Sequence, residues 1–167
     1  MHPPRLEEGH WEVDTVVDKR TGKEYVVFSL LEKKTETYLA FRIPGKTSEA
    51  VMNLMNELHD EYGEHFPQIF KTITVDNGSE FADFAKVEKR GTKAFFAHPY
   101  TAWERPQNEC HNGLFRAFVP KGASLEQYTD EDILAAADEL NGRPQSKLGY
   151  RTPEELFDAF LDCVFAA

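Results

Sequence analysis

The sequence predicts a single α/β domain built on a five-stranded mixed sheet that is flanked by helices. Three β-rich segments follow one another near the start of the chain, and two more are each preceded by a helical segment. Strands that are tightly joined pair antiparallel, whereas a strand reached through a helix can pair parallel. Three antiparallel strands followed by two parallel ones therefore account for the order of the elements.

The first three strands are predicted at residues 11–18, 25–31 and 37–43, where β-branched and aromatic residues predominate. Short polar connections at residues 19–23 and 32–34 separate them. Connections of this length favour an antiparallel meander.

Helical and strand segments then alternate. We expect them in the order helix, strand, short helix and strand, at residues 47–62, 71–76, 79–90 and 93–97. Thr47 or Ser48 caps the first helix, in which apolar residues recur at steps of three and four. Ser79 is the predicted start of the short helix, and Gly91 follows its end.

Three helices are predicted in the remainder of the chain. Arg105-Pro106 begins the first, because proline at the first helical position loses only an amide that has no partner there. Thr129 begins the second in a capping-box pattern. Thr152 and Pro153 begin the third, with an acidic first turn after them. Neither a repeat nor a linker divides these 167 residues, so we interpret residues 1–167 as one domain.

The composition restricts the classes of function. No apolar run is long enough to span a membrane. Cys110 and Cys163 form neither a CxxC pair nor a disulfide framework, which fits a reducing cytoplasm. The net charge of −10 counts against tight DNA binding by this chain alone. It is compatible with DNA as a substrate that another domain and a metal ion help to hold.

Three acidic residues lie where such a fold places chemistry. Asp14 interrupts an apolar strand, where a buried carboxylate is costly unless it is paired or binds a cation. Asp76 ends the fourth strand, at the edge of the sheet where ligand sites gather. Glu109 lies in the first turn of its helix. Each also has an ordinary alternative: a solvated edge aspartate, an Asx turn and a surface glutamate, respectively.

The three carboxylates would converge if the first and fourth strands were neighbours. Asp14 and Asp76 would then lie side by side, with the helix of Glu109 against them. Two aspartates and a glutamate make an all-oxygen site that suits Mg²⁺ or Mn²⁺ better than zinc.

Six blocks of sequence carry a resemblance to a known family. Two of them are Gly-His-Trp-Glu-Val-Asp-Thr-Val-Val and Thr-Val-Asp-Asn-Gly-Ser-Glu-Phe. The six blocks occupy residues 9–17, 74–81, 98–105, 108–116, 140–144 and 148–157. In this order they resemble the catalytic core of bacterial insertion-sequence transposases, above all the insertion-sequence-thirty family, within the retroviral-integrase superfamily of Asp-Asp-Glu recombinases.

The resemblance implies an RNase H-like fold and a transposase or integrase core that cleaves DNA strands and transfers them during transposition. It also implies that Asp14, Asp76 and Glu109 bind two Mg²⁺ or Mn²⁺ ions. The expected partners are DNA, as transposon ends and target, and a second copy of the chain in a homodimer. No small-molecule cofactor is expected. Family members usually carry an upstream helix-turn-helix region, which we expect to be absent here.

Polar and aromatic residues around the triad are the predicted DNA contacts. They are Asn77, Trp103, Arg105, Gln107, Asn108, Asn112, Arg116 and Lys121. Helix capping and core packing are the alternative roles for these side chains.

Two other functions stay open at this point. An RNase H-like metal-dependent nuclease would cut DNA without joining it. A catalytically inactive module would serve in DNA docking or assembly, although the intact acidic triad argues against that alternative.

Overall fold

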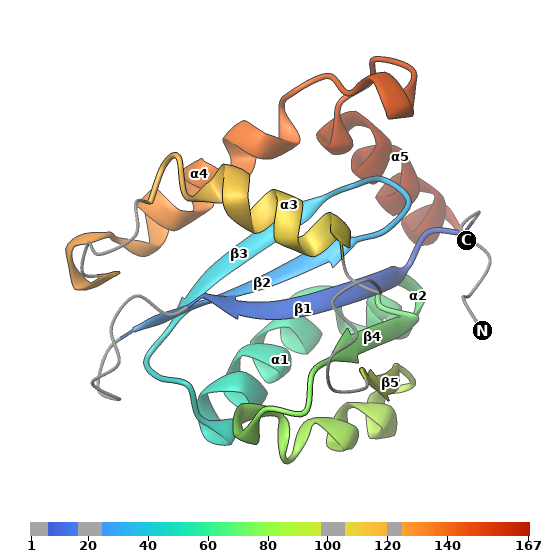
Figure 1. Cartoon of the computed structure of the whole chain (residues 1–167). Helices are drawn as coiled ribbons and strands as arrows, with labels where there is room; N and C mark the ends of the chain where they lie inside the picture. The colour runs from blue at the N-terminus through green and yellow to red at the C-terminus, as the bar shows by residue number, and fades with distance from the viewer. Residues whose placement is uncertain (1–6, 17–24, 98–105, 120–124) are drawn as a thin grey trace.

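A computed structural model of the chain describes residues 7–16, 25–97, 106–119 and 125–167, except for the side chains of residues 106–110 and 126 (Figure 1). Its sheet comprises β1 (His10–Val16), β2 (Val26–Glu32), β3 (Tyr38–Ile43), β4 (Thr72–Val75) and β5 (Lys93–Phe96). The strand order is β3-β2-β1-β4-β5. β1, β2 and β3 pair antiparallel, and β4 pairs parallel with both β1 and β5. The predicted mixed sheet is confirmed.

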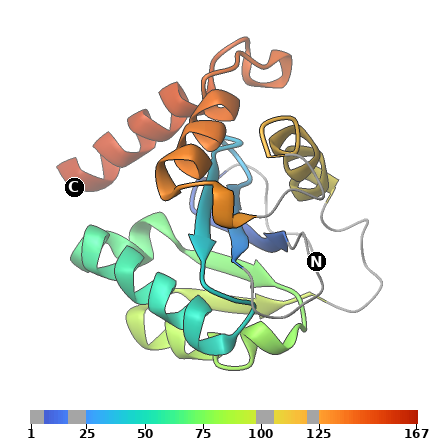
Figure 2. The ribbon, with the colours of Figure 1, turned by 90° about the vertical axis from the view of Figure 1, so that its left-hand side faces the viewer.

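Helices cover both faces of this sheet (Figures 1 and 2). They are α1 (Ser48–Tyr62), α2 (Phe66–Ile69), α3 (Pro106–Phe115), α4 (Asp130–Asn141) and α5 (Pro153–Ala166). α1 and α2 lie on one face, and α3 and α4 lie on the other. α5 reaches the first layer through Phe157, whose ring meets Trp11 of β1 edge-on. No helix in the described ranges is long and apolar enough to cross a membrane.

Short 3-10 helices complete the chain between these elements. They are η1 (Gly63–His65), η2 (Ser79–Phe81), η3 (Phe84–Arg90), η5 (Leu125–Gln127) and η6 (Ser146–Leu148). The single helix predicted from Ser79 is wrong in detail, because η2 and η3 take its place and Gly78 is the capping residue of η2. α2, which the sequence analysis did not predict, follows η1 directly.

Side-chain caps confirm the predicted starts of α1, α4 and α5. Thr47 accepts a hydrogen bond from the Ala50 amide and so begins α1. Thr129 and Thr152 each form a complete capping box with the acidic residue three positions later. These caps fix where the helices of both layers begin.

The alternation of side chains along β1 determines which layer each residue faces. Trp11 and Val13 belong to the core that includes α1, and Val16 belongs to the core that includes α4. Asp14 therefore points to the α4 side of the sheet, with Val16. This is also the side that α3 covers.

Candidate active site

Asp14 and Asp76 come from adjacent parallel strands. β1 and β4 are in register at Glu12 and Thr74. Asp14 lies two positions after Glu12, still within β1, and Asp76 lies two positions after Thr74, directly after the end of β4. Both side chains are half-buried. Continuing the register places the two carboxylates on the same face of the sheet, next to each other.

A hydrogen bond joins Asp14 to helix α3. The Asn112 side-chain amide donates to Asp14 Oδ2 at 2.6 Å, and the Thr15 amide donates to Asp14 Oδ1 at 2.9 Å. Asn112 lies three residues after Glu109, so the two positions share one side of the helix. The helix that carries Glu109 is thereby held against the strand that carries Asp14.

Two hydroxyl groups fix the orientation of the Asn112 amide. Tyr38 Oη donates to Asn112 Oδ1 at 2.8 Å, and Ser29 Oγ donates to the same atom at 3.3 Å. Ser29 faces Asp14 directly across the β1–β2 pair. Burial, and to a smaller extent the charge of Asp14, raises the pKa of the Tyr38 phenol. The phenol therefore stays protonated and can donate.

The Asp76 carboxylate is held by the loop that follows it. Asp76 Oδ1 accepts a hydrogen bond from the Gly78 amide at 2.7 Å, the Asx-turn contact that was the alternative explanation for this residue. Asp76 Oδ2 has no hydrogen-bond partner in the described part of the chain. Asn77 donates instead to the Ala97 carbonyl, at the end of β5. The loop is thus attached to β5 while one Asp76 oxygen remains available.

A buried glutamate lies below this loop. Glu80 is 1% exposed, and its Oε1 atom accepts a hydrogen bond from Thr15 Oγ1 at 3.4 Å. A Cβ atom added to Gly78 would lie 2.5 Å from Glu80 Oε2. A Cβ atom at position 78 would therefore force the carboxylate end of the Glu80 side chain to move.

A second polar cluster holds α3 at His111, the residue before Asn112. His111 is buried, stacks on the Tyr38 ring at 5.9 Å and lies 3.3 Å from Glu36 Oε2. Glu36 is also paired with Lys147 at 3.0 Å. This environment suits a structural role for His111 better than a role as a metal ligand.

The remaining predicted site residues differ in how far they are described. Glu109, Gln107 and Asn108 lie in α3, but the structure does not describe their side chains. The predicted contacts Trp103, Arg105 and Lys121 lie outside the described residues. Arg116 follows α3, half-buried, and its charge acts on Tyr38. Ser29, Tyr38 and Glu80 were not predicted. Ser29 alone had a visible signal, as a polar residue in the apolar run Val-Val-Phe-Ser-Leu-Leu.

The donor set fits a hard divalent cation. Asp14 and Asp76 offer carboxylate oxygens from neighbouring strands, and such ligands suit Mg²⁺ and Mn²⁺. Within the residues described, which exclude the Glu109 side chain, no group of three or more acidic, histidine or cysteine ligands is assembled.

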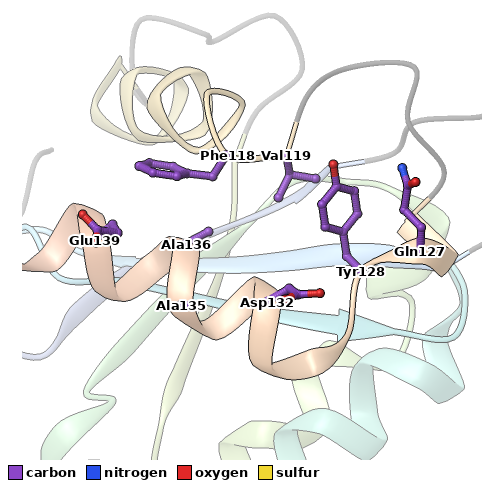
Figure 3. A pocket seen from close by; sticks show the side chains of 8 residues that line it. All are labelled: Phe118, Val119, Gln127, Tyr128, Asp132, Ala135, Ala136 and Glu139. Atoms are coloured by element: carbon purple, nitrogen blue, oxygen red, sulfur yellow. The ribbon is translucent and has the colours of Figure 1, made fainter.

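A separate cavity of about 650 Å³ lies beside α4 (Figure 3). It is lined by Phe118, Val119, Gln127, Tyr128, Asp132, Ala135, Ala136 and Glu139. Neither Asp14 nor Asp76 contributes to it. The carboxylate site is therefore distinct from this cavity.

Several curated transposases are similar to the chain. The probable transposase for insertion-like sequence element IS1161 of Streptococcus salivarius is 34% identical over 90% of this chain and 42% of its own length. The transposase for insertion sequence element IS1086 of Cupriavidus metallidurans is 33% identical over 96% of this chain and 48% of its own length. Transposase InsI for insertion sequence element IS30C of Escherichia coli is 31% identical over 90% of this chain and 38% of its own length. The chain thus spans less than half the length of these relatives.

A solved structure shows the same fold. The catalytic core domain of BIV integrase superposes with a TM-score of 0.68 over 96% of this chain and 98% of that one, at 16% identity. No family model matches the chain. The integrase-core architecture, which is RNase H-like, is confirmed. Together with the sequence relatives, it confirms the predicted resemblance: over about nine tenths of its length, the chain is homologous to insertion-sequence transposases, among them that of IS30.

Proposed function

We propose that the chain is the catalytic core of a DNA transposase, which cleaves DNA strands and joins them to target DNA by phosphoryl transfer. Asp14, Asp76 and Glu109 are the metal-binding triad in this proposal. The observation that carries it is the shared register of β1 and β4, which brings Asp14 and Asp76 together on the face that α3 covers. The homology to transposases supports the same reaction class.

Each residue has a defined part in the proposed reaction. Asp14, Asp76 and Glu109 would hold two Mg²⁺ or Mn²⁺ ions. When bound, these ions activate water or a DNA 3′-hydroxyl and stabilise the leaving oxygen. Asn112 orients Asp14, and the Gly78 amide orients Asp76. The predicted contacts Asn77, Trp103, Arg105, Gln107, Asn108, Arg116 and Lys121 would position the DNA, and Asn112 could serve both purposes.

The substitution Asp76→Asn tests the triad, because it keeps the size of the side chain but removes the carboxylate. We expect Mn²⁺ affinity to fall at least about 100-fold, with cleavage and joining of labelled element-end DNA lost together. Asp60→Asn is the matched control, since that side chain is 84% exposed on α1. Unchanged Mn²⁺ binding or retained joining in Asp76→Asn would refute the assignment.

The same assay separates the alternatives. A joined product identifies a transferase, whereas cleavage without joining identifies a nuclease. DNA binding without either product, in a folded protein that binds Mn²⁺, identifies a docking module. The proposed homodimer is tested by the molar mass in solution.

A further inference from the structure

A turn near the end of the chain contains a strained tyrosine. In the described residues, only Glu36 and Tyr150 have a positive φ without being glycine, at 62° and 63°. Tyr150 follows Gly149, whose φ is 64°, in the turn between η6 and α5. Bulky residues rarely adopt this conformation, because the Cβ atom approaches the backbone closely.

Hydrogen bonds on both sides fix this conformation. The Tyr150 amide donates to the Gln145 carbonyl at 2.9 Å, and the Arg151 amide donates to the Leu148 carbonyl at 3.3 Å. Gln145 and Arg151 also form a β-bridge. The turn is therefore well closed around a residue type that disfavours it.

Packing does not explain the presence of the tyrosine. Its side chain is 76% exposed, the highest value among the large apolar and aromatic side chains that the structure describes. The Tyr150 ring makes no aromatic or cation–π contact with any other residue that the structure describes. A strained and exposed aromatic residue points to a role outside the folded core.

The charge around the turn is opposite to that of the chain. Residues 141–152 contain Arg143, Lys147 and Arg151 and no acidic residue, although the whole chain has a net charge of −10. Arg143 and Arg151 are exposed. A basic surface with an exposed aromatic ring is typical of proteins that hold single-stranded nucleic acid.

The turn is also tied to the helix of the candidate active site. Lys147 pairs with Glu36 at 3.0 Å, and Glu36 contacts His111 of α3 at 3.3 Å. Asn112, the partner of Asp14, is the next residue in that helix. The exposed Lys147 thus connects the turn, through the buried Glu36 and His111, to the helix that contacts Asp14.

We propose that the turn formed by residues 145–151 is a DNA-contact element, in which the Tyr150 ring stacks on an unpaired base and Arg151 contacts the adjacent phosphate. This inference rests on the proposed function, since it takes DNA as the partner. It adds a specific DNA contact in the connection between α4 and α5, apart from the acidic triad.

The test compares two substitutions at the same position. Tyr150→Asn removes the ring and places a residue that tolerates positive φ, whereas Tyr150→Phe keeps the ring. Phe165→Asn is the control, because Phe165 is also exposed, at 51%, but lies in the acidic helix α5. Affinity for a duplex with a single-stranded overhang, and for the blunt duplex, is measured by fluorescence anisotropy at low ionic strength.

We expect Tyr150→Asn to weaken binding of the overhang DNA about five-fold or more, with less effect on the blunt duplex. Its melting temperature should be unchanged or about 2–4 °C higher, because strain is relieved. Tyr150→Phe and Phe165→Asn should bind like the parent chain. A 5-iodouracil base in the overhang should form its photochemical crosslink with Tyr150.

Other results overturn the inference in distinguishable ways. If Tyr150→Asn binds the overhang DNA as tightly as the parent chain does, and the crosslinks form elsewhere on the chain, the proposed contact is rejected and a protein partner for the turn is favoured. Failure of the parent chain to bind or crosslink any DNA at low ionic strength would reject this contact and weaken the proposed function with it. Loss of binding together with a lower melting temperature in Tyr150→Asn would assign the residue a structural role instead.

Discussion

Asn112 is the residue whose removal tests the site most directly. Its amide group donates to Asp14 at 2.6 Å and accepts from Tyr38 at 2.8 Å. Asn112→Ala deletes a hydrogen bond to a charged group, which contributes about 1.5–3 kcal/mol. It also leaves the buried Tyr38 hydroxyl without this acceptor, at a further cost of about 1 kcal/mol or more.

We therefore expect Asn112→Ala to lower the free energy of unfolding by about 3 kcal/mol, measured by urea denaturation. For a chain of this size, that corresponds to a fall in melting temperature of roughly 6–12 °C. Tyr38→Phe should cost about 1 kcal/mol alone and less in the Asn112→Ala background, because both changes remove the same contact. Asn53→Ala, an exposed amide on α1, is the matched control and should change stability by at most about 0.5 kcal/mol.

A second measurement separates positioning from stability. If Asn112 orients Asp14 for metal binding, Asn112→Ala should weaken Mn²⁺ affinity about 10- to 100-fold under conditions where the protein is fully folded. Tyr38→Phe should weaken it less, because the bond from Asn112 to Asp14 remains. Unchanged Mn²⁺ affinity in Asn112→Ala, or strict additivity with Tyr38→Phe, would refute the reasoning.

Two further predictions concern the loop after β4 and a buried phenol. Gly78→Ala should destabilise the fold by about 1–3 kcal/mol, because the new methyl group would lie 2.5 Å from Glu80 Oε2. In the background of Glu80→Ala the same change should cost far less, which a double-mutant cycle by urea denaturation would detect; equal costs would contradict it. Burial, with Glu61 nearby, raises the pKa of Tyr62 to about 12. The stabilising effect of the neutral Tyr62 phenol is complete below pH 10 and is lost between about pH 10 and 12, by less than about 1.4 kcal/mol per pH unit because the ring is partly exposed to solvent. Tyr62→Phe should flatten this part of the stability curve, and an identical slope in the two proteins would disprove the assignment.

The sheet and most helix starts could be predicted because local chemistry determines them. Thr129 and Thr152 form their capping boxes with residues only three positions away. The parallel pairing of β4 with β1 follows from the helix between them. Such features depend on short stretches of sequence, which is why their residues are recognisable without a structure.

The prediction of a single short helix from Ser79 failed because its apolar spacing is ambiguous. The buried side chains Phe81, Phe84 and Val87 recur at steps of three, and the 3-10 helix η3 aligns Phe84 and Val87 on one side. An α-helix would also bring residues three positions apart onto one side. The spacing of the apolar residues therefore does not distinguish one α-helix from the two short helices η2 and η3.

The polar contacts of the candidate site were less accessible to prediction. Asn112 and Asp14 are 98 residues apart, and Asn112 and Tyr38 are 74 apart. Tyr38 reads as an ordinary core aromatic residue, because nothing near it in sequence shows that its hydroxyl will meet an amide. The packing of α3 against β1, β2 and β3 creates this network.

The proposed triad combines three different kinds of restraint. Asp14 lies inside a strand that is paired on both sides, so the sheet itself limits its movement. Asp76 lies just beyond the ladder and depends on the Gly78 amide. Glu109 depends on α3, which is attached to the sheet through Asn112 and His111. On this proposal, Glu109 is the one ligand whose position depends on a helix and not on the sheet. The contacts of α3, more than those of the strands, then determine how readily the site is completed.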